Sequence, residues 1–359
     1  MSLYTNNLYL EDVKRVADIA LPWEKFQNSS VVLSGATGLL GSFFIDVLMQ
    51  KNTEGLNCTV YALGRSENRA AERFSKWWGD SHLKFILYDV NKPFSADGFG
   101  KIDYVLHLAS NTHPIQYATD PIGTITTNII GLQNMLDFAV SHKAERFVFA
   151  SSNEIYGENR GDVEMFDEKY CGYIDSNTLR AGYPESKRCG EALCQAYKSQ
   201  KGLDAVISRF TRSYGPTMLM SDTKAISQFI RKGVAKEDIV LKSAGTQNYS
   251  YTYMADAISG LLTIILKGES GEAYNIADEA SNITLKDLAK IIADYAGKKV
   301  VFEIPDAVEA SGYSKATKAL LDGSKLKKLG WKPRYGIKEG IERTLDILNT
   351  INKTLYGKL

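Results

Sequence analysis

A short apolar run that leads directly into closely spaced glycines constrains the fold of this chain more than any other feature. Residues 31–34 read Val-Val-Leu-Ser, and Gly35, Gly38 and Gly41 follow before an apolar helical stretch. Glycines at this spacing allow a tight turn and a close approach of the backbone to a ligand, and the following helix N-terminus attracts anions. The turn is therefore predicted to hold the pyrophosphate of a dinucleotide through Gly35, Thr37, Gly38, Leu39, Leu40 and Gly41.

Short β-branched runs alternate with helical patterns downstream of this turn. The expected strands are residues 30–34, 58–63, 83–88, 104–108, 146–150 and 205–209, and the long expected helices are 121–142 and 183–201. Alternation of this kind predicts an α/β fold with a doubly wound parallel Rossmann sheet. After residue 216 the pattern is less regular, with later helices expected at 284–297 and 337–352, so we expect a smaller C-terminal α/β lobe.

This pattern divides the chain into three parts. Residues 1–29 form an amphipathic helical leader, residues 30–210 form the NAD(P)-binding Rossmann domain, with 250–277 returning to it, and residues 211–249 and 278–359 form the substrate-binding lobe. Helices 121–142 and 183–201 carry apolar residues on more than one face, which favours packing against a second copy of the chain. We expect a homodimer.

The charge balance excludes several classes of partner. Lys plus Arg total 43 and Asp plus Glu total 42, so no overall field would draw the chain to nucleic acid or to an anionic membrane. No apolar run approaches the length of a bilayer span, and residues 1–12 lack the order of a signal peptide, which predicts a cytoplasmic protein. The four cysteines and four histidines show no metal-ligand spacing, so no metal is expected.

Further candidates for the cofactor site follow the expected strands. Asp89 and Val90 come after the third strand, where Asp89 either accepts a hydrogen bond from the adenine amine or caps the strand end. Leu108, Ala109 and Ser110 lie at the end of the fourth strand, at the sheet edge where open α/β sheets bind ligands. Arg65 ends the second strand without an acidic neighbour, which favours the 2′-phosphate of NADP(H). NAD(H) stays open, because Arg65 is also interpretable as a solvated loop residue.

A tyrosine and a lysine mark the catalytic end. Tyr183 and Lys187 are four residues apart at the start of the second long helix, so they share one helix face. A phenol is a weak base at neutral pH, and an adjacent ammonium favours its phenolate. Ser152 follows the fifth strand and brings a hydroxyl to the same sheet edge. The three residues are the candidate catalytic group, with Tyr183 as general acid and base.

Together these residues resemble the extended short-chain dehydrogenases, the NAD-dependent epimerase/dehydratase family of nucleotide-sugar enzymes. The likeness covers roughly residues 31–331. It implies that Ser152 orients the substrate oxygen, that Tyr183 moves its proton, and that Lys187 holds the cofactor ribose and lowers the pKa of the tyrosine. It also implies hydride transfer between the nicotinamide and a sugar carbon.

Within that family the sequence looks most like UDP-glucuronate decarboxylases and nucleotide-sugar 4,6-dehydratases. Residues 107–110, Gly131, residues 154–157 and residues 209–216 carry this likeness. By resemblance, Asn128 joins the cofactor site, and the substrate-binding candidates are Pro114, Tyr117, Asn153 and Arg180.

Four departures from the family pattern bear on the reaction and on substrate binding. Asn153 stands where dehydratases place an acid, and an amide cannot protonate a leaving group, although Glu154 remains available as a base. Lys318 and Ala319 occupy the place of the arginine that decarboxylases use for a carboxylate. Tyr249 replaces the family's diphosphate-binding arginine, whereas Arg212 stands in place of an asparagine, so we infer that the positive charge has moved to Arg212. Lys224 is either a second nucleotide-binding cation or an exposed lysine at a helix start.

Three functions are compatible with these residues. The first is epimerisation, dehydration or decarboxylation of a nucleotide-activated sugar with recycling of the cofactor, in the setting of polysaccharide biosynthesis. The second is net reduction of a nucleotide-activated keto-sugar or ketose by NADPH. The third is a non-catalytic NADP-binding protein, which the presence of Ser152, Tyr183 and Lys187 together argues against.

Overall fold

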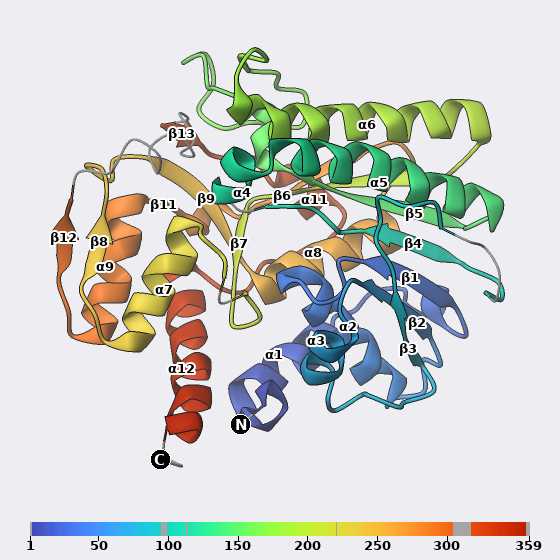
Figure 1. Cartoon of the computed structure of the whole chain (residues 1–359), viewed down its shortest axis with the longest axis horizontal. Coiled ribbons are helices and arrows are strands. Elements are labelled where there is room, and N and C mark those ends of the chain that lie inside the picture. The colour runs from blue at the N-terminus through green and yellow to red at the C-terminus, as the bar shows by residue number, and fades with distance from the viewer. Residues whose placement is uncertain (1, 95–98, 113, 220, 304–316, 357–359) are drawn as a thin grey trace.

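The main sheet of this computed structural model is parallel and doubly wound. The structure describes residues 2–94, 99–112, 114–219, 221–303 and 317–356, with side chains as far as residue 351. Within them, seven parallel strands follow the order β10-β6-β5-β4-β1-β2-β3 (Figure 1). Their bounds are β1 (Ser30–Ser34), β2 (Thr59–Gly64), β3 (Leu83–Leu87), β4 (Tyr104–His107), β5 (Arg146–Ser152), β6 (Ala205–Phe210) and β10 (Ala273–Ile276).

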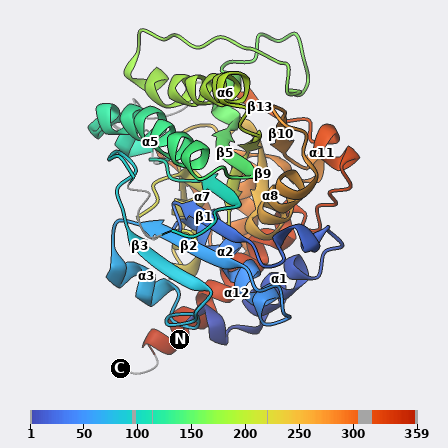
Figure 2. The ribbon, with the colours of Figure 1, turned by 90° about the vertical axis from the view of Figure 1, so that its right-hand side faces the viewer.

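Helices cover both faces of this sheet, because its strands are apolar on both sides. Val32 packs in the layer of α5 and α6, whereas Val31 and Leu33 pack in the layer of α2 and α8. Figure 2 shows these two layers on opposite sides of the sheet. The helices of this region are α2 (Leu39–Asn52), α3 (Glu67–Arg73), α4 (Pro114–Thr119), α5 (Pro121–Ser141), α6 (Gly182–Lys201) and α8 (Met254–Lys267), with the 3-10 turns η3 (Asn153–Tyr156) and η4 (Leu179–Ala181).

A smaller lobe lies beside the carboxyl ends of the main strands, on the left of Figure 1. Its strand β9 pairs with β7, β11 and β13, and β8 pairs with β12. The elements are β7 (Arg212–Tyr214), α7 (Ala225–Ala235), β8 (Ile239–Leu241), β9 (Asn248–Tyr253), η5 (Glu279–Ser281), β11 (Asn282–Thr284), α9 (Leu285–Ala296), β12 (Val300–Phe302), β13 (Lys318–Ala319) and α12 (Ile337–Tyr356). The short helix α11 (Ser324–Lys328) contacts α8 and β10 of the main layers instead. Residues 250–253 lie in β9, so the chain returns to the Rossmann layers with α8 rather than at residue 250.

The leader forms η1 (Leu3–Thr5), α1 (Asn7–Ala17) and η2 (Trp23–Phe26), and α1 contacts α2, α8 and α12. Asp12 on α1 is fully buried. Its carboxylate accepts hydrogen bonds from the hydroxyls of Tyr253 and Tyr335, both at 2.6 Å, and from Nη2 of Arg343 at 2.8 Å. These partners all belong to the C-terminal part of the chain, so Asp12 ties the leader to the lobe.

A second buried carboxylate ties the leader to the Rossmann domain. Asp46 on α2 accepts hydrogen bonds from the Tyr4 hydroxyl at 2.7 Å, from Nε1 of Trp77 at 2.9 Å and from the Tyr9 hydroxyl. Arg73 completes the cluster with an ion pair to Asp46 at 2.6 Å. The leader is therefore held by polar contacts to both halves of the molecule.

The fold class predicted from the sequence is confirmed. Each strand expected between residues 30 and 209 is present, with ends displaced by at most two residues. None of the helices in the described part of the chain combines the length and apolar character that a membrane crossing requires.

Candidate active site

A cavity of about 810 Å³ opens at the carboxyl ends of the main strands and extends into the small lobe. Its walls come from the loops after β1, β2, β3, β4 and β5, from the first turns of α6, and from β7, α7, β8 and β9. This is the edge at which open α/β sheets bind their ligands, where the strand order reverses between β1 and β4. Except for Asn128, every site residue predicted from the sequence lines this cavity.

The glycine turn has the shape that a dinucleotide pyrophosphate needs. Gly35 has φ of +75°, and a Cβ there would lie 2.7 Å from the backbone nitrogen of Ala109. A Cβ on Gly41 would collide with the carbonyl oxygen of Gly35. Gly38 precedes α2 without a side-chain cap, so the first N–H groups of the helix stay available to an anion. The cradle therefore fits a dinucleotide, and the residues that would hold it stay a prediction.

The end of β2 presents two arginines. Arg65 is exposed and lines the cavity together with Ser66 and Arg69. Arg69 was missed from the sequence, because an arginine in a charged helical stretch is usually solvated. Ser66 accepts a hydrogen bond from the backbone N–H of Arg69 and so begins α3 directly beside the cavity.

Asp89 serves as a strand-end cap at the third strand. Its Oδ1 accepts a hydrogen bond of 3.0 Å from the backbone N–H of Asn91, while the residue also lines the cavity beside Val90. Asp89 therefore caps the end of the strand, which is one of the two roles that the sequence left open. An additional contact of Asp89 to an adenine stays a prediction.

Asn128 is buried behind the cavity wall instead of lining it. Its side chain accepts a hydrogen bond of 2.7 Å from Oγ of Ser110 and donates one of 2.9 Å to Oγ of Ser186. The residue fixes the orientation of Ser110, which does line the cavity together with Leu108 and Ala109. Family resemblance alone could not tell a direct cofactor contact from this supporting position.

The predicted catalytic group converges on one wall of the cavity. Ser152 ends β5, and Tyr183 and Lys187 face it from the first turns of α6. Ser152 forms a side-chain hydrogen bond with Tyr183, and Nζ of Lys187 donates to the carbonyl oxygen of Ala150 at 2.8 Å. All three residues are at least nine-tenths buried.

Burial moves the pKa values of this group in opposite directions. It raises the pKa of Tyr183 to about 12, against hydrogen bonds from Ser152 and Ser110 that lower it. It lowers the pKa of Lys187 to about 7, against the charge of Glu191 that raises it. An acid–base tyrosine beside a lysine that titrates near neutrality is typical of a site built to move protons.

An ion pair lies next to Tyr183. Tyr117 stacks on Tyr183 with ring centroids 4.8 Å apart, and the Arg180 guanidinium lies 5.0 Å above the Tyr117 ring. Nη2 of Arg180 donates to Glu154 at 2.6 Å. Burial raises the pKa of Glu154, but the charges of Arg180 and Arg212 outweigh it and leave that pKa below its usual value. Glu154 is therefore a carboxylate at neutral pH.

Asn153 and Pro114 complete the wall around this pair. Asn153 is buried directly after Ser152, and Pro114 begins α4, which carries Tyr117. An amide at position 153 leaves this wall without a second acid beside Glu154.

Arg212 and Tyr249 form a stacked pair on neighbouring strands. The guanidinium carbon of Arg212 lies 3.6 Å from the ring centroid of Tyr249, and both residues line the cavity. Nη1 of Arg212 is buried without a hydrogen-bond partner among the described residues. Stacking on an aromatic ring leaves the planar donor edge of a guanidinium available to an anion.

Further cations approach the cavity from α7 and β8. Nζ of Lys224 lies 3.2 Å from Oγ1 of Thr112 and 3.1 Å from Oδ2 of Asp222, so its position is fixed at the start of α7. Lys232 on α7 and Lys242 directly after β8 also line the cavity but were missed, because a lysine on a helix is usually solvated and β8 is too short to carry a periodic pattern. Lys318 is not a lining residue: its Nζ pairs with Glu164 at 2.6 Å.

Comparison with known proteins agrees with this geometry. A sequence model of the NAD dependent epimerase/dehydratase family matches residues 31–277. UDP-glucuronic acid decarboxylase 6 of Arabidopsis thaliana is 30% identical over 88% of this chain and 87% of its own length. UDP-glucuronic acid decarboxylase 1 of Xenopus tropicalis is 29% identical over 88% of this chain and 71% of its own length.

Solved structures share the fold. A dTDP-glucose 4,6-dehydratase from Streptomyces venezuelae, solved with NAD bound, gives a TM-score of 0.78 at 23% identity over 91% of this chain and 98% of its own. The UDP-glucuronic acid 4-epimerase of Bacillus cereus was solved in complex with UDP-glucuronic acid and NAD. It gives a TM-score of 0.77 at 21% identity over 90% of this chain and 99% of its own. The resemblance inferred from the sequence is thus confirmed, and the chain belongs to the NAD dependent epimerase/dehydratase family of nucleotide-sugar enzymes that work by hydride transfer.

Proposed function

We propose that this enzyme oxidises the sugar of a nucleotide-activated sugar transiently, changes the neighbouring carbon and then restores the cofactor. The juxtaposition of Tyr183 with the Arg180–Glu154 pair carries the proposal, because it places an acid–base group and a carboxylate in the same cavity. A nicotinamide bound along the glycine turn would exchange the hydride with a sugar carbon.

The protein residues have separate tasks in this reaction. The Ser152 hydroxyl holds the sugar oxygen, and Tyr183 takes the proton from it during oxidation and returns it during reduction. The Lys187 ammonium stabilises the phenolate while the proton is on the substrate. Glu154, ionised beside Arg180, can accept a proton from the carbon next to a ketone, whereas Asn153 cannot protonate a departing hydroxyl. Glu154 and Asn153 together therefore favour epimerisation or decarboxylation over dehydration.

A uronic acid is the substrate class that the sugar end supports best. Nε and Nη1 of Arg180 are buried without hydrogen-bond partners among the described residues. A guanidinium with unsatisfied donors beside the catalytic tyrosine suits a carboxylate on the sugar. Several relatives are named UDP-glucuronic acid decarboxylases, so UDP-glucuronic acid is the first substrate to test.

The test has two parts. Freshly purified protein is denatured, and the released nicotinamide nucleotide is identified and quantified by mass spectrometry. The intact protein is then incubated with UDP-glucuronic acid, and the products are separated by chromatography. Near-stoichiometric bound cofactor and a product formed without net oxidation support the recycling reaction. An empty protein that consumes NADPH with nucleotide-linked ketones would overturn it.

Net reduction by NADPH is the second candidate. Arg65, Ser66 and Arg69 line the cavity at the end of β2, where an NAD-preferring site usually has a carboxylate. Two guanidiniums and a hydroxyl suit the 2′-phosphate of NADP(H), and net reductases draw on the NADPH pool. The released nucleotide in the same experiment distinguishes NADP from NAD.

We expect Arg212→Ala to weaken the binding of UDP by about 10- to 100-fold, as loss of one or two charge-assisted hydrogen bonds would. The affinity of the cofactor should not change. Isothermal titration of cofactor-loaded protein with UDP measures the effect. Tyr249→Phe is the matched control, because it keeps the ring that supports Arg212. An Arg212→Ala variant that binds UDP as tightly as the native chain would exclude the proposed charge relocation.

We also propose that two copies associate through α5 and α6. On α5, Ile122 is 75% exposed and Ile130 is 45% exposed in the single chain, which leaves apolar surface beside the long helices. Sedimentation velocity decides the point, and a monomeric mass would contradict it.

A further inference from the structure

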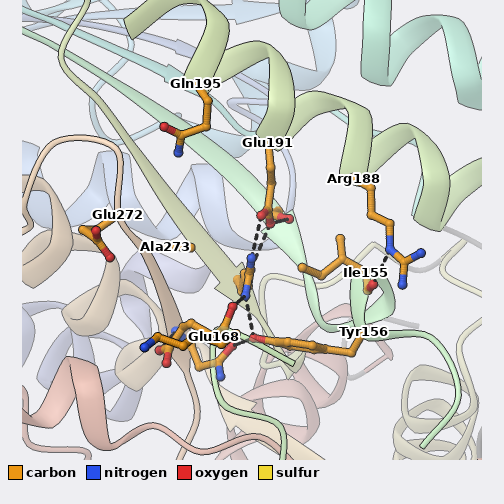
Figure 3. A network of polar contacts seen from close by, with 12 residues as sticks. Ile155, Tyr156, Glu168, Arg188, Glu191, Gln195, Glu272 and Ala273 are labelled. Carbon is orange, nitrogen blue, oxygen red and sulfur yellow. Dashed lines mark hydrogen bonds and ion pairs between the residues drawn. The ribbon is translucent and has the colours of Figure 1, made fainter. Parts of the chain in front are cut away.

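An ion pair lies behind the catalytic residues, outside the steps assigned above. Glu191 sits one helical turn after Lys187 on α6, and Arg209 lies on β6, opposite Ser151 of the neighbouring strand β5. Nη2 of Arg209 reaches Oε2 of Glu191 at 2.6 Å and Nε reaches Oε1 at 3.0 Å, which makes the pair bidentate. In Figure 3 Glu191 extends from α6 toward the network that contains Tyr156 and Glu168.

Arg209 is fixed from its far side as well. Its Nη1 donates to the Tyr156 hydroxyl at 2.9 Å and to the carbonyl oxygen of Glu168 at 2.7 Å. The Tyr156 hydroxyl donates in turn to Oδ1 of Asn275 on β10 at 2.6 Å. Only 10% of the Arg209 side chain and 14% of the Glu191 side chain are exposed, so water competes little for these bonds.

The same carboxylate holds the end of β5. Oγ of Ser151 donates to Oε1 of Glu191 at 2.5 Å, and Ser151 is the residue before Ser152. One turn earlier on α6, Nζ of Lys187 donates to the carbonyl oxygen of Ala150. Two neighbouring side chains of α6 therefore bind two consecutive residues of β5, directly before the catalytic serine.

We propose that Glu191 and Arg209 are positioning residues that hold Ser152 and Lys187 in register, and that the Glu191 carboxylate supplies negative charge beside the Lys187 ammonium. The geometry of the pair carries this inference, and the proposed function enters only where it predicts an effect on turnover. Neither residue lines the cavity.

The charged surroundings of Lys187 single out Glu191. The titratable groups that face Lys187 are Glu191 and Cys194 on its own helix, Tyr183 one turn before it, and His107 on β4. Burial raises the pKa of the Cys194 thiol and lowers that of His107 to about 3, while burial also keeps the Tyr183 phenol protonated. Of these groups Glu191, paired with Arg209, supplies the negative charge that opposes the burial that lowers the pKa of Lys187.

The test measures the titration of Lys187 directly and needs no substrate. In protein labelled with 13C at the lysine Cε positions, a signal that titrates near neutral pH stands apart from ordinary lysines, and Lys187→Met identifies it by its loss. Glu191→Gln should lower its midpoint by about one pH unit, because a favourable charge is removed. Arg209→Gln should raise it, because the charge of Glu191 is no longer shared with a guanidinium.

Opposite shifts separate this role from a purely structural one, since loosened packing would expose Lys187 in both variants and move both midpoints upward. Asp204→Asn is the matched control: Asp204 pairs with Arg146 at 2.8 Å at the opposite end of β5 and β6, and the Lys187 midpoint should not move. Glu191→Asp should restore most of the native value. An unchanged midpoint in Glu191→Gln, or a shift of the same sign in Arg209→Gln, would overturn the proposal.

Turnover gives a second readout. With a substrate identified, Glu191→Gln should lower kcat about tenfold at neutral pH with little change in KM, because neither residue touches the cavity. If no nucleotide sugar is turned over by the native enzyme, the proposed function fails while the Lys187 titration still decides the role of Glu191.

Discussion

Tyr183→Phe should lower turnover by about 10²- to 10⁴-fold, the usual contribution of a positioned acid–base group. The phenylalanine ring keeps its stacking on Tyr117, so the fold and the affinity for the cofactor should persist. The loss is confined to the proton that the hydroxyl exchanges with the sugar oxygen. Turnover of the identified nucleotide sugar, together with fluorescence titration of NAD(P)H binding, separates the two effects.

The pH dependence adds a check on the same residue. Lys187 is protonated below its pKa of about 7 and loses its charge as the pH rises, whereas Tyr183, with a pKa raised to about 12, stays neutral in the free site. Activity that relies on the ammonium should therefore fall as the pH rises through the pKa of Lys187. The residual activity of the Tyr183→Phe variant should not show this fall. Tyr197→Phe, on the same helix but hydrogen-bonded to Asp137 outside the cavity, is the control. Full activity in Tyr183→Phe would end the catalytic assignment.

Asp12→Ala should destabilise the protein by about 3–5 kcal/mol, the range found when one partner of a buried ion pair is removed. The change leaves Arg343 and the hydroxyls of Tyr253 and Tyr335 without their shared acceptor in a site where Asp12 is fully buried. Urea unfolding followed by circular dichroism measures the shift of the transition.

Glu11→Ala provides a matched control for this effect. Glu11 also pairs with Nη2 of Arg343, at 3.3 Å, but its side chain is 56% exposed. Exposed pairs contribute at most about 1 kcal/mol, so this variant should unfold close to the native midpoint. Equal losses in both variants would show that the Asp12 cluster has no special role.

Much of the cofactor half of the site could be predicted from the sequence, because its residues follow strand ends. A strand, a glycine turn and a helix in succession determine where Gly35 and Gly41 lie, and parallel strands bring Ser152 and Ser110 to one edge. Tyr183 and Lys187 could be paired for a different reason, because residues four apart share one face of α6.

The rest depends on contacts between segments that are distant in the chain. Lys242 reaches the cavity from the end of β8, a strand of three residues that is too short for a periodic pattern, and Lys232 reaches it from α7, where a helical lysine is usually solvated. Arg69 could be placed only once α3 was seen to start beside the cavity. Asn128 was predicted to belong to the cofactor site but lies behind the cavity wall. A family motif does not tell which residues contact a ligand and which support the residues that do.

The two carboxylates that hold the leader differ in when their partners are synthesised. Asp46 finds Tyr4, Tyr9, Arg73 and Trp77 within the first 77 residues, so its cluster can close while the chain is still growing. Asp12 must wait for Tyr253, Tyr335 and Arg343, which follow it by 241 residues or more in the chain. Domains generally fold as they emerge, N-terminal parts first. The leader is therefore anchored early on one side and locked late on the other, which makes docking of the lobe onto α1 one of the last steps of folding.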